Sequence, residues 1–318
     1  GDMTTALAMA VVAHGRAVAL SDDDGRTPAS PDNLLGLGAT ASLASDRPKR
    51  GDHRALVAVQ TSTSTVLARL DLEKGARDRP AEEDLVTALM IDRLAETCGI
   101  NDRPEIELGD GDELHIQQVT AGEILAGTWN GHTSIAWSLP DGSWAPEPPA
   151  APAGILSGSF HPLHNGHELL QQTAQHTLAG PVYYELPLIN ADKPPLDYLS
   201  IEERRSAFTD IPLALSRAAT FAEKADLYPG VTFVVGADTA ARVVEQRFYE
   251  SAKSMATAFE TIRSRGCRFL VGGRLRGSDF DDLEDLDLSD DVADLFTGIP
   301  EARFRYDISS SALREAAD

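Results

Sequence analysis

Residues 158–167 read Gly-Ser-Phe-His-Pro-Leu-His-Asn-Gly-His, and this stretch decides the fold of the second half of the chain. It follows a short apolar run at 154–156 and leads into a helix-forming sequence from Glu168. A strand, a turn of small residues and a helix in that order place backbone N–H groups at the carboxyl edge of a sheet, which favours an anion. His164 and His167 lie on one face of the first helical turn. Two imidazoles beside such a site predict chemistry on a phosphate group.

Apolar strands and helical segments alternate after this stretch, as a doubly wound parallel sheet requires. The expected strands are 154–157, 182–188, 213–215, 231–235 and 267–271, and the expected helices are 166–177, 201–208, 239–246, 253–264, 290–296 and 310–316. Strands that are apolar throughout are typical of a parallel sheet covered on both faces. Ligands of such sheets bind at the carboxyl ends of the strands. We therefore expect the segments that follow the strands to open into one crevice.

A second candidate phosphate site lies near the C-terminus, where residues 307–314 read Asp-Ile-Ser-Ser-Ser-Ala-Leu-Arg. A hydroxyl-rich helix start, Ser309 to Ser311, with Arg314 one turn further on can hold phosphate by N-cap geometry and a charged fork. Together the two stretches resemble the His-x-Gly-His and Ile-Ser-Ser-Thr-x-x-Arg signatures of the nucleotidylyltransferase superfamily, with Ser311 in place of the usual Thr. The resemblance covers about residues 152–318. It implies an α/β fold with a Rossmann-like doubly wound parallel sheet.

The segment after the expected fourth strand reads Gly236-Ala-Asp238-Thr239. Gly236 would let a ligand approach the backbone, and Asp238 could accept hydrogen bonds from ribose hydroxyls. On the residues alone, Asp238 could instead be the N-cap of a helix that begins at Thr239. Adenylyltransferases that act on nicotinamide and nicotinate mononucleotide carry a similar Gly-x-Asp-Thr. That resemblance implies that Asp238 belongs to the nucleotide site.

A loop after the second expected strand, residues 190–196, contains Lys193-Pro, and Arg204 and Arg205 follow on the next helix. The same adenylyltransferases have a similar Lys-Pro loop followed by an Arg. The resemblance implies that Lys193 and either Arg204 or Arg205 face phosphates. The alternative is that both arginines belong to a solvated surface, since Glu202 and Glu203 could neutralise them.

The resemblance implies transfer of AMP from ATP to the phosphate of nicotinamide or nicotinate mononucleotide, with release of pyrophosphate and with Mg²⁺ arriving on ATP. No protein nucleophile is needed, because the acceptor phosphate attacks the α-phosphorus in line. The expected catalytic residues are His164, His167, Lys193 and Arg314, and the expected nucleotide-binding residues are Gly158, Ser159, Phe160, Gly166, Gly236, Asp238, Ser309, Ser310 and Ser311. Tyr183, Tyr184 and Tyr198 are the nearest aromatic candidates to stack on a base.

Several alternatives stay open at this point. The chain could be a non-catalytic pyridine-nucleotide-binding or regulatory protein. It could also use another acceptor, such as phosphopantetheine or an alcohol phosphate, or CTP in place of ATP.

Two features suggest metal ions without predicting a metal site. His161, His164 and His167 could bind zinc, but the turn between them makes three convergent rings awkward. The acidic run 278–294 lacks the spacing of a calcium loop and is typical of a solvated face. Arg274 and Arg276, just before this run, are further candidates for contact with a triphosphate.

The sequence divides into residues 1–139, a connector at 140–153 with five prolines, and residues 154–318. The first part contains strand-like segments at 34–37, 55–60 and 66–70, a Gly-rich stretch from Gly36 and an amphipathic helix at about 82–96. It resembles the latter half of a CinA-type nicotinamide-nucleotide amidase domain, which implies a smaller, partial α/β domain. The Ser-Cys-Thr-Gly-Gly segment with that family's serine nucleophile has no counterpart here, so no amidase activity is expected.

The chain of 318 residues has a formal net charge of −22, which argues against nucleic acid or an anionic membrane as partner. No apolar run is expected to reach the length of a membrane span. Two cysteines, Cys98 and Cys267, indicate neither a disulfide framework nor a metal site, which fits a cytoplasmic protein. The basic residues Arg47, Lys49 and Arg50 could bind an anion or an adjoining subunit of a homo-oligomer, or simply be solvated.

Overall fold

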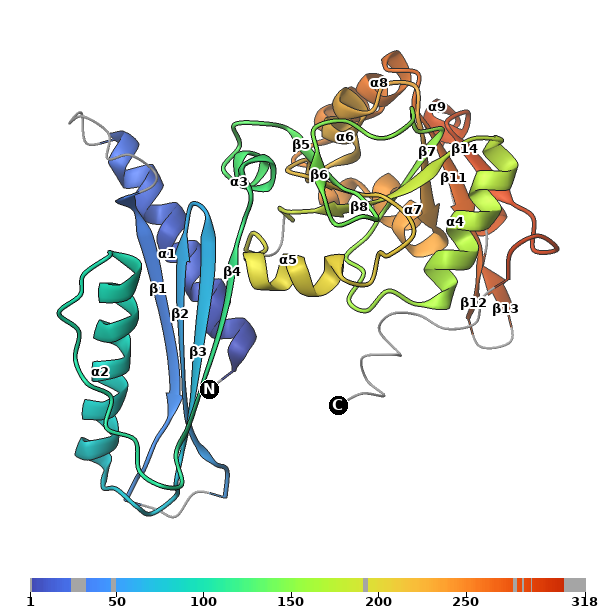
Figure 1. Cartoon of the computed structure of the whole chain (residues 1–318). Coiled ribbons are helices and arrows are strands. Elements are labelled where there is room, and N and C mark those ends of the chain that lie inside the picture. The colour runs from blue at the N-terminus through green and yellow to red at the C-terminus, as the bar shows by residue number, and fades with distance from the viewer. Residues whose placement is uncertain are drawn as a thin grey trace. The chain divides into compact units, whose positions relative to one another are not determined.

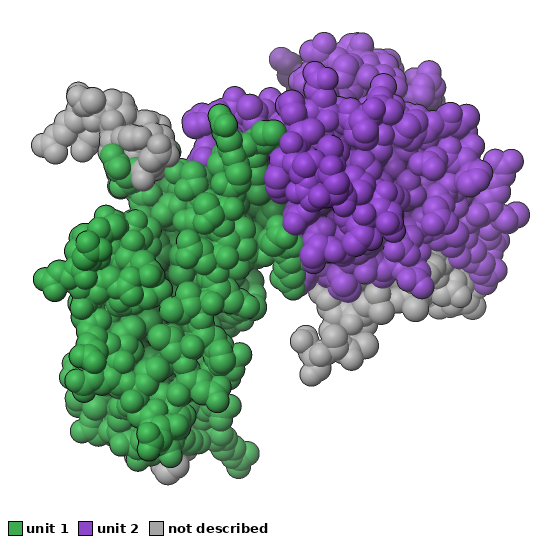
Figure 2. Space-filling model, in the orientation of Figure 1, with its two compact units in different colours: residues 1–126, 192–203 green, residues 127–191, 204–318 purple. Residues whose placement is uncertain are grey.

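The computed structural model describes residues 2–23, 33–46, 50–190, 194–276, 279–281, 283–286 and 288–305 (Figure 1). The chain forms two compact units, coloured separately in Figure 2. Unit 1 comprises Gly1–Ala126 and Asp192–Glu203, and unit 2 comprises Gly127–Ala191 and Arg204–Asp318. Both units combine helices with β-sheets, so the expected α/β class is confirmed at this level.

These units differ from the division at residues 139 and 154 that the sequence suggested. The proline-rich connector contains a strand, Trp144–Ala145, which pairs with Ile135–Ser138 in the sheet of unit 2. Residues before and inside the connector therefore belong to the second unit. In unit 1, the backbone N–H of Tyr198 donates to the Thr65 hydroxyl at 2.9 Å, which ties the later segment to the first sheet.

Unit 1 is built on an antiparallel sheet in the order β1-β2-β3-β4, with a helix against each face (Figure 1). Its elements are α1 (Met3–Asp23), β1 (Leu35–Ser42), β2 (His53–Thr61), β3 (Ser64–Leu72), α2 (Arg79–Thr97) and β4 (Glu113–Thr120). On one face α1 packs Ala6, Leu7 and Ala10 against the sheet. On the other, Leu85 and Leu89 of α2 complete a separate apolar core. Two further helices, α3 (Glu123–Trp129) and α5 (Tyr198–Arg205), contain boundaries between the units.

Helix α1 packs closely on strand β1, which contains the start of the Gly-rich stretch, and Gly36 and Gly38 allow this approach. A Cβ at Gly38 would lie 2.2 Å from the carbonyl oxygen of Ala6, and one at Gly36 would lie 2.0 Å from that of Ala10. The window Met3–Ser21 has a mean hydropathy of 1.4 and is long enough to cross a membrane, so the expectation about apolar runs is wrong. This is weak evidence for a span, since core helices and signal sequences have the same length and composition.

Unit 2 is built on an eight-stranded mixed sheet in the order β14-β11-β10-β7-β8-β9-β5-β6. Its parallel strands are β7 (Gly154–Ser157), β8 (Val182–Pro187), β9 (Leu213–Ser216), β10 (Thr232–Gly236), β11 (Arg268–Gly272) and β14 (Phe296–Ile299). β5 (Ile135–Ser138) and β6 (Trp144–Ala145) extend the sheet in antiparallel fashion. Five of the six parallel strands match the sequence-based strands to within about two residues. β5, β6 and β14 were not expected.

Helices cover both faces of this sheet, because its strands are apolar at successive positions. The helices are α4 (Asn165–Leu178), α6 (Phe221–Leu227), α7 (Ala237–Val244), α8 (Ala252–Ser264) and α9 (Asp290–Ala293). The core on one face joins Ile155, Phe233 and Phe269 to residues of α6, α7 and α8. The alternate residue Leu156 faces the opposite side, where α4 packs against β7, β8 and β10.

The expected helix 290–296 is shorter than the sequence suggested. It ends at Ala293, and the chain turns into β14 three residues later. The expected helix 310–316 lies outside the described residues. A hairpin of β12 (Arg274–Arg276) and β13 (Asp279–Asp281) precedes α9, and short 3₁₀ turns are present at Gln246–Phe248 and Leu283–Asp285.

The order in which the chain adds parallel strands to the sheet reverses between β7 and β10. The chain first proceeds from β7 through β8 to β9, and then returns to β10 on the other side of β7. Loops that leave β7 and β10 therefore diverge to opposite sides. The crevice at such a point is where ligands bind in open α/β sheets.

Candidate active site

The His-x-Gly-His stretch and the Gly-x-Asp-Thr segment leave adjacent strands at this point of reversal. β7 and β10 pair directly, with Leu156 opposite Val234. The first stretch follows β7 and enters α4, and Gly236 ends β10 and caps α7. Both segments thus carry a helix N-terminus at the carboxyl edge of neighbouring strands. Backbone N–H groups of two helices are available there for an anion.

Phe160 fixes the turn that precedes the histidines. Its backbone has a φ of 44°, which is the left-handed region, and its ring is 2 % exposed. The ring packs edge-on against His167, Tyr184 and Phe208, with centroids 5.1–5.3 Å apart. A Cβ at Gly158 would lie 2.8 Å from this ring, so the glycine is required by the buried aromatic. The strained backbone costs on the order of 1 kcal/mol and persists because this packing holds it.

The two histidines cap α4. His164 is the N-cap residue, and its Nδ1 accepts a hydrogen bond from the Gly166 N–H at 3.2 Å. The His167 Nδ1 accepts from the His164 N–H at 3.4 Å, which completes a reciprocal cap. The rings stack, with centroids 3.7 Å apart. Because both Nδ1 atoms accept, the proton of each neutral ring is assigned to Nε2.

Burial makes both rings neutral at physiological pH. Burial and, to a smaller extent, repulsion from His164 together lower the pKa of His167 to about 4. The pKa of His164 is also lowered by burial. The pair therefore presents two Nε2–H donors rather than two cations. Neutral donors fixed by a helix cap can stabilise charge that develops on phosphate oxygens.

The structure separates the two neighbouring arginines. The Arg204 Nη1 donates to the carbonyl oxygen of Ser159 at 3.3 Å, which brings this guanidinium to the His-x-Gly-His turn. Arg205 turns elsewhere, with Nη1 donating to the Ser138 hydroxyl at 3.3 Å and the guanidinium 5.9 Å from the Trp144 ring centroid. Of the two candidates, Arg204 is the one beside the candidate site.

Gly236 and Asp238 open the second helix of the site. Helix α7 begins at Ala237 with Gly236 as its N-cap residue, so the alternative that Asp238 is the N-cap is wrong. Among the described residues, its chain neighbours aside, no atom lies within 4 Å of the position that a Cβ on Gly236 would take, which leaves room for a ligand there. Asp238 is exposed in the first helical turn. Its role toward ribose stays a prediction.

The three tyrosines named as stacking candidates are buried and offer no free face. Tyr183 packs edge-on against Trp137 in the core, and the Tyr184 hydroxyl donates to the His167 carbonyl at 3.4 Å. Tyr198 belongs to unit 1, where its hydroxyl donates to the Ser62 carbonyl at 2.6 Å. The prediction that one of these tyrosines stacks on a base is therefore wrong.

The remaining expected residues divide into two groups. Ser159 is exposed in the turn, and Gly166 is buried in the first turn of α4. Five others, Lys193, Ser309, Ser310, Ser311 and Arg314, lie outside the described residues, as do Arg47 and Lys49.

A buried ion pair between Lys224 and Glu185, which the sequence analysis missed, lies beside the start of the His-x-Gly-His turn. The Lys224 Nζ lies 2.7 Å from both carboxylate oxygens of Glu185, and both side chains are almost fully buried. The Ser216 hydroxyl donates to the same carboxylate at 2.5 Å. The backbone carbonyl of Glu185 accepts from the Gly158 N–H at 3.0 Å, which anchors the start of the turn. A charged residue inside the apolar run 182–188 was the sequence signal.

Within the described ranges, no group of three or more His, Cys, Asp or Glu side chains is arranged to hold a metal ion. For the three histidines that suggested zinc, the Nδ1 atoms of His164 and His167 are engaged in the helix cap. No protein family model, no curated protein and no solved structure matches this chain. The resemblances drawn from its motifs therefore stay predictions, and the function rests on the residues themselves.

Proposed function

We propose that unit 2 transfers AMP from ATP to the phosphate of a small acceptor, nicotinamide or nicotinate mononucleotide, and releases pyrophosphate. One observation carries the proposal: His164 and His167 cap α4 beside the open N-terminus of α7, where the strand order reverses. The proposal takes the six parallel strands as a Rossmann-like doubly wound sheet, in which ligands bind at the point where the strand order reverses. The chemistry that suits two imidazole donors and two helix N-termini is phosphoryl or nucleotidyl transfer.

The proposed reaction needs no covalent intermediate on the protein. An oxygen of the acceptor phosphate forms a bond to the α-phosphorus of ATP, while the bond from that phosphorus to the α,β-bridging oxygen breaks. Pyrophosphate leaves with the electron pair. The protein then supplies position and charge stabilisation, and Mg²⁺ would enter as part of the MgATP substrate.

Each residue of the candidate site has one role in this reaction. The Nε2–H groups of His164 and His167 donate to oxygens of the α- and β-phosphates as negative charge moves to the leaving group. Arg204, held at the turn through Ser159, adds a fixed positive charge. The backbone of Gly236 and the side chain of Asp238 receive the nucleoside. Arg314 and the serines 309–311 are proposed to complete the phosphate contacts.

The class of acceptor rests on two resemblances in separate stretches of the chain. The Lys193-Pro loop and Gly236-x-Asp238-Thr239 resemble segments of pyridine-mononucleotide adenylyltransferases. Residues 1–139 resemble part of an amidase that acts on nicotinamide mononucleotide. Both point to pyridine nucleotides.

The test is an acceptor panel. The full chain is incubated with MgATP and, in separate reactions, nicotinamide mononucleotide, nicotinate mononucleotide, phosphopantetheine or ribose 5-phosphate, and pyrophosphate release is followed. We expect pyrophosphate release with one or both mononucleotides and with neither of the other two acceptors. Parallel reactions with CTP in place of ATP test the identity of the nucleotide donor. Pyrophosphate release with phosphopantetheine alone would contradict the proposed acceptor but would support nucleotidyl transfer. Binding of nucleotide without release from any acceptor would contradict the transferase and favour a non-catalytic pyridine-nucleotide-binding protein.

A further inference from the structure

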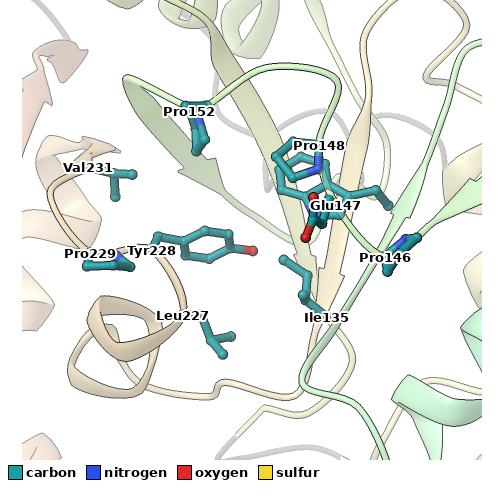
Figure 3. Close-up of a pocket in the computed structure, with 11 residues that line it drawn as sticks. Ile135, Pro146, Glu147, Pro148, Pro152, Leu227, Tyr228, Pro229 and Val231 are labelled. Atoms are coloured by element: carbon teal, nitrogen blue, oxygen red, sulfur yellow. The ribbon is translucent and has the colours of Figure 1, made fainter.

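Unit 2 contains a cavity of about 310 Å³ at the edge of the sheet opposite the histidines (Figure 3). Pro152 comes just before β7 and Val231 just before β10, so both mark the amino ends of these strands. The histidines follow the carboxyl end of β7. The cavity is lined by Ile135, Trp137, Pro146, Glu147, Pro148, Ala151, Pro152, Leu227, Tyr228, Pro229 and Val231. Its volume is in the range of sites for small organic molecules.

The walls of the cavity are rigid and almost entirely apolar. Four of the lining residues are prolines, whose rings restrict the backbone around them. Trp137 is 2 % exposed and meets the Tyr228 ring edge-on, with centroids 6.5 Å apart. Both aromatic side chains are fixed by the same core that joins the sheet to α6 and α8. A ligand would therefore enter a site that is already formed, which reduces the entropy lost on binding.

The Tyr228 hydroxyl is the unusual group of this cavity. The side chain is 4 % exposed, and its oxygen has no hydrogen-bond partner among the described residues. Figure 3 shows the phenol directed into the space between Ile135 and Glu147. A buried polar group without a partner costs about 1–3 kcal/mol, so such groups call for an explanation. Burial also raises the pKa of this phenol, which keeps it protonated and able to donate.

Glu147 defines the charge that the cavity accepts. It is the charged residue among those that line the cavity, and its side chain is exposed at the rim. A carboxylate there repels anions, and the net charge of −22 acts in the same direction. The cavity thus combines apolar walls, one buried donor and a negative rim.

We propose that this cavity binds a small neutral ring compound that carries a hydrogen-bond acceptor, such as an aromatic amide, with the acceptor on the Tyr228 hydroxyl. The ring packs among Trp137, Ile135 and the prolines. The site is separate from the one proposed for nucleotide transfer, and its occupancy does not depend on that function. Benzamide is a suitable probe, because it offers a flat apolar ring and one carbonyl acceptor.

The experiment measures binding of three probes of similar shape to the full chain by ligand-observed NMR titration. Benzamide presents a neutral acceptor, benzoate a charged one, and ethylbenzene none. The variants are Tyr228→Phe, which keeps the ring and removes the hydroxyl, and Glu147→Gln, which removes the charge at the rim. Tyr249→Phe is the matched control, because the Tyr249 hydroxyl donates to the Val243 carbonyl at 2.7 Å and does not line the cavity.

We expect benzamide to bind wild type and to bind Tyr228→Phe about tenfold more weakly, the effect of one hydrogen bond. Ethylbenzene should bind both proteins equally, and benzoate should bind wild type more weakly than benzamide, a difference that Glu147→Gln reduces. Tyr228→Phe should have a melting temperature at or above that of wild type, because the variant lacks a buried hydroxyl that has no partner, whereas Tyr249→Phe should lower it. Failure of benzamide to bind wild type at about 10 mM, or equal affinity for Tyr228→Phe, would overturn the proposal.

Discussion

Acidification tests how His167 is held in the candidate site. Burial lowers its pKa in the folded protein to about 4, against about 6.5 in an unfolded chain. The native state therefore prefers the neutral ring. The stability contributed by His167 is therefore fully present above about pH 6.5 and is lost as the pH falls from there toward 4. Between about pH 7.5 and about pH 5 the two pKa values give a loss of about 2 kcal/mol. Partial solvent access to the ring reduces this to about 1–2 kcal/mol.

The assay has two parts. Titration of the histidine Cε1–H signals by NMR, with His167→Gln to assign the resonance, gives the pKa directly. Urea unfolding of wild type and His167→Gln at about pH 7.5 and about pH 5 isolates the contribution of His167. The lowered pKa values of His14 and His164 act in the same direction, but both proteins contain these residues. A His167 pKa of about 6 or higher in the folded, nucleotide-free protein would refute the neutral Nε2–H donor.

Five further substitutions test three separate features. Arg204→Ala should weaken ATP binding about tenfold, whereas its neighbour Arg205→Ala should change it by less than about twofold, and equal losses in calorimetric titrations would remove Arg204 from the site. Gly38→Ala should lower the free energy of unfolding of unit 1 by about 2 kcal/mol, because its Cβ would lie 2.2 Å from a backbone oxygen of α1. Gly15→Ala, with open space around it in α1, should raise that free energy by about 1 kcal/mol in the same urea experiment, and the opposite order would contradict the packing of α1 on β1. Lys224→Met should cost about 3–5 kcal/mol, because it leaves a buried carboxylate unpaired, and a variant as stable as wild type would show that the carboxylate finds other compensation.

Local patterns were sufficient for much of unit 2. Its buried parallel strands appear in the sequence as apolar runs, and the small-residue turn before His164 placed α4 correctly. Strands β5 and β14 are four residues long, and β6 has only two, beside prolines, so their pairing comes from the sheet rather than from propensity. Helix α1 was missed because apolar residues occur all round it, with buried Ala10 and exposed Met9 side by side.

The site itself was only partly readable from sequence. Spacing placed His164 and His167 on one helical turn, but their stacking and reciprocal capping depend on the buried ring of Phe160. Arg204 and Arg205 are adjacent in sequence, and only tertiary contacts assign one to the turn. The first residue of α7 was likewise undetermined, since either Gly236 or Asp238 is an acceptable N-cap.

Pyrophosphate release by the His167→Ala variant tests whether the histidines at the start of α4 act on phosphate during nucleotidyl transfer. Wild type and variant are compared at saturating MgATP and nicotinamide or nicotinate mononucleotide, with circular dichroism to show that the variant is folded. We expect wild type to release pyrophosphate and His167→Ala to release it at least about a hundredfold more slowly, as loss of one preorganised donor does elsewhere. Release at the wild-type rate by a folded His167→Ala protein would contradict the account.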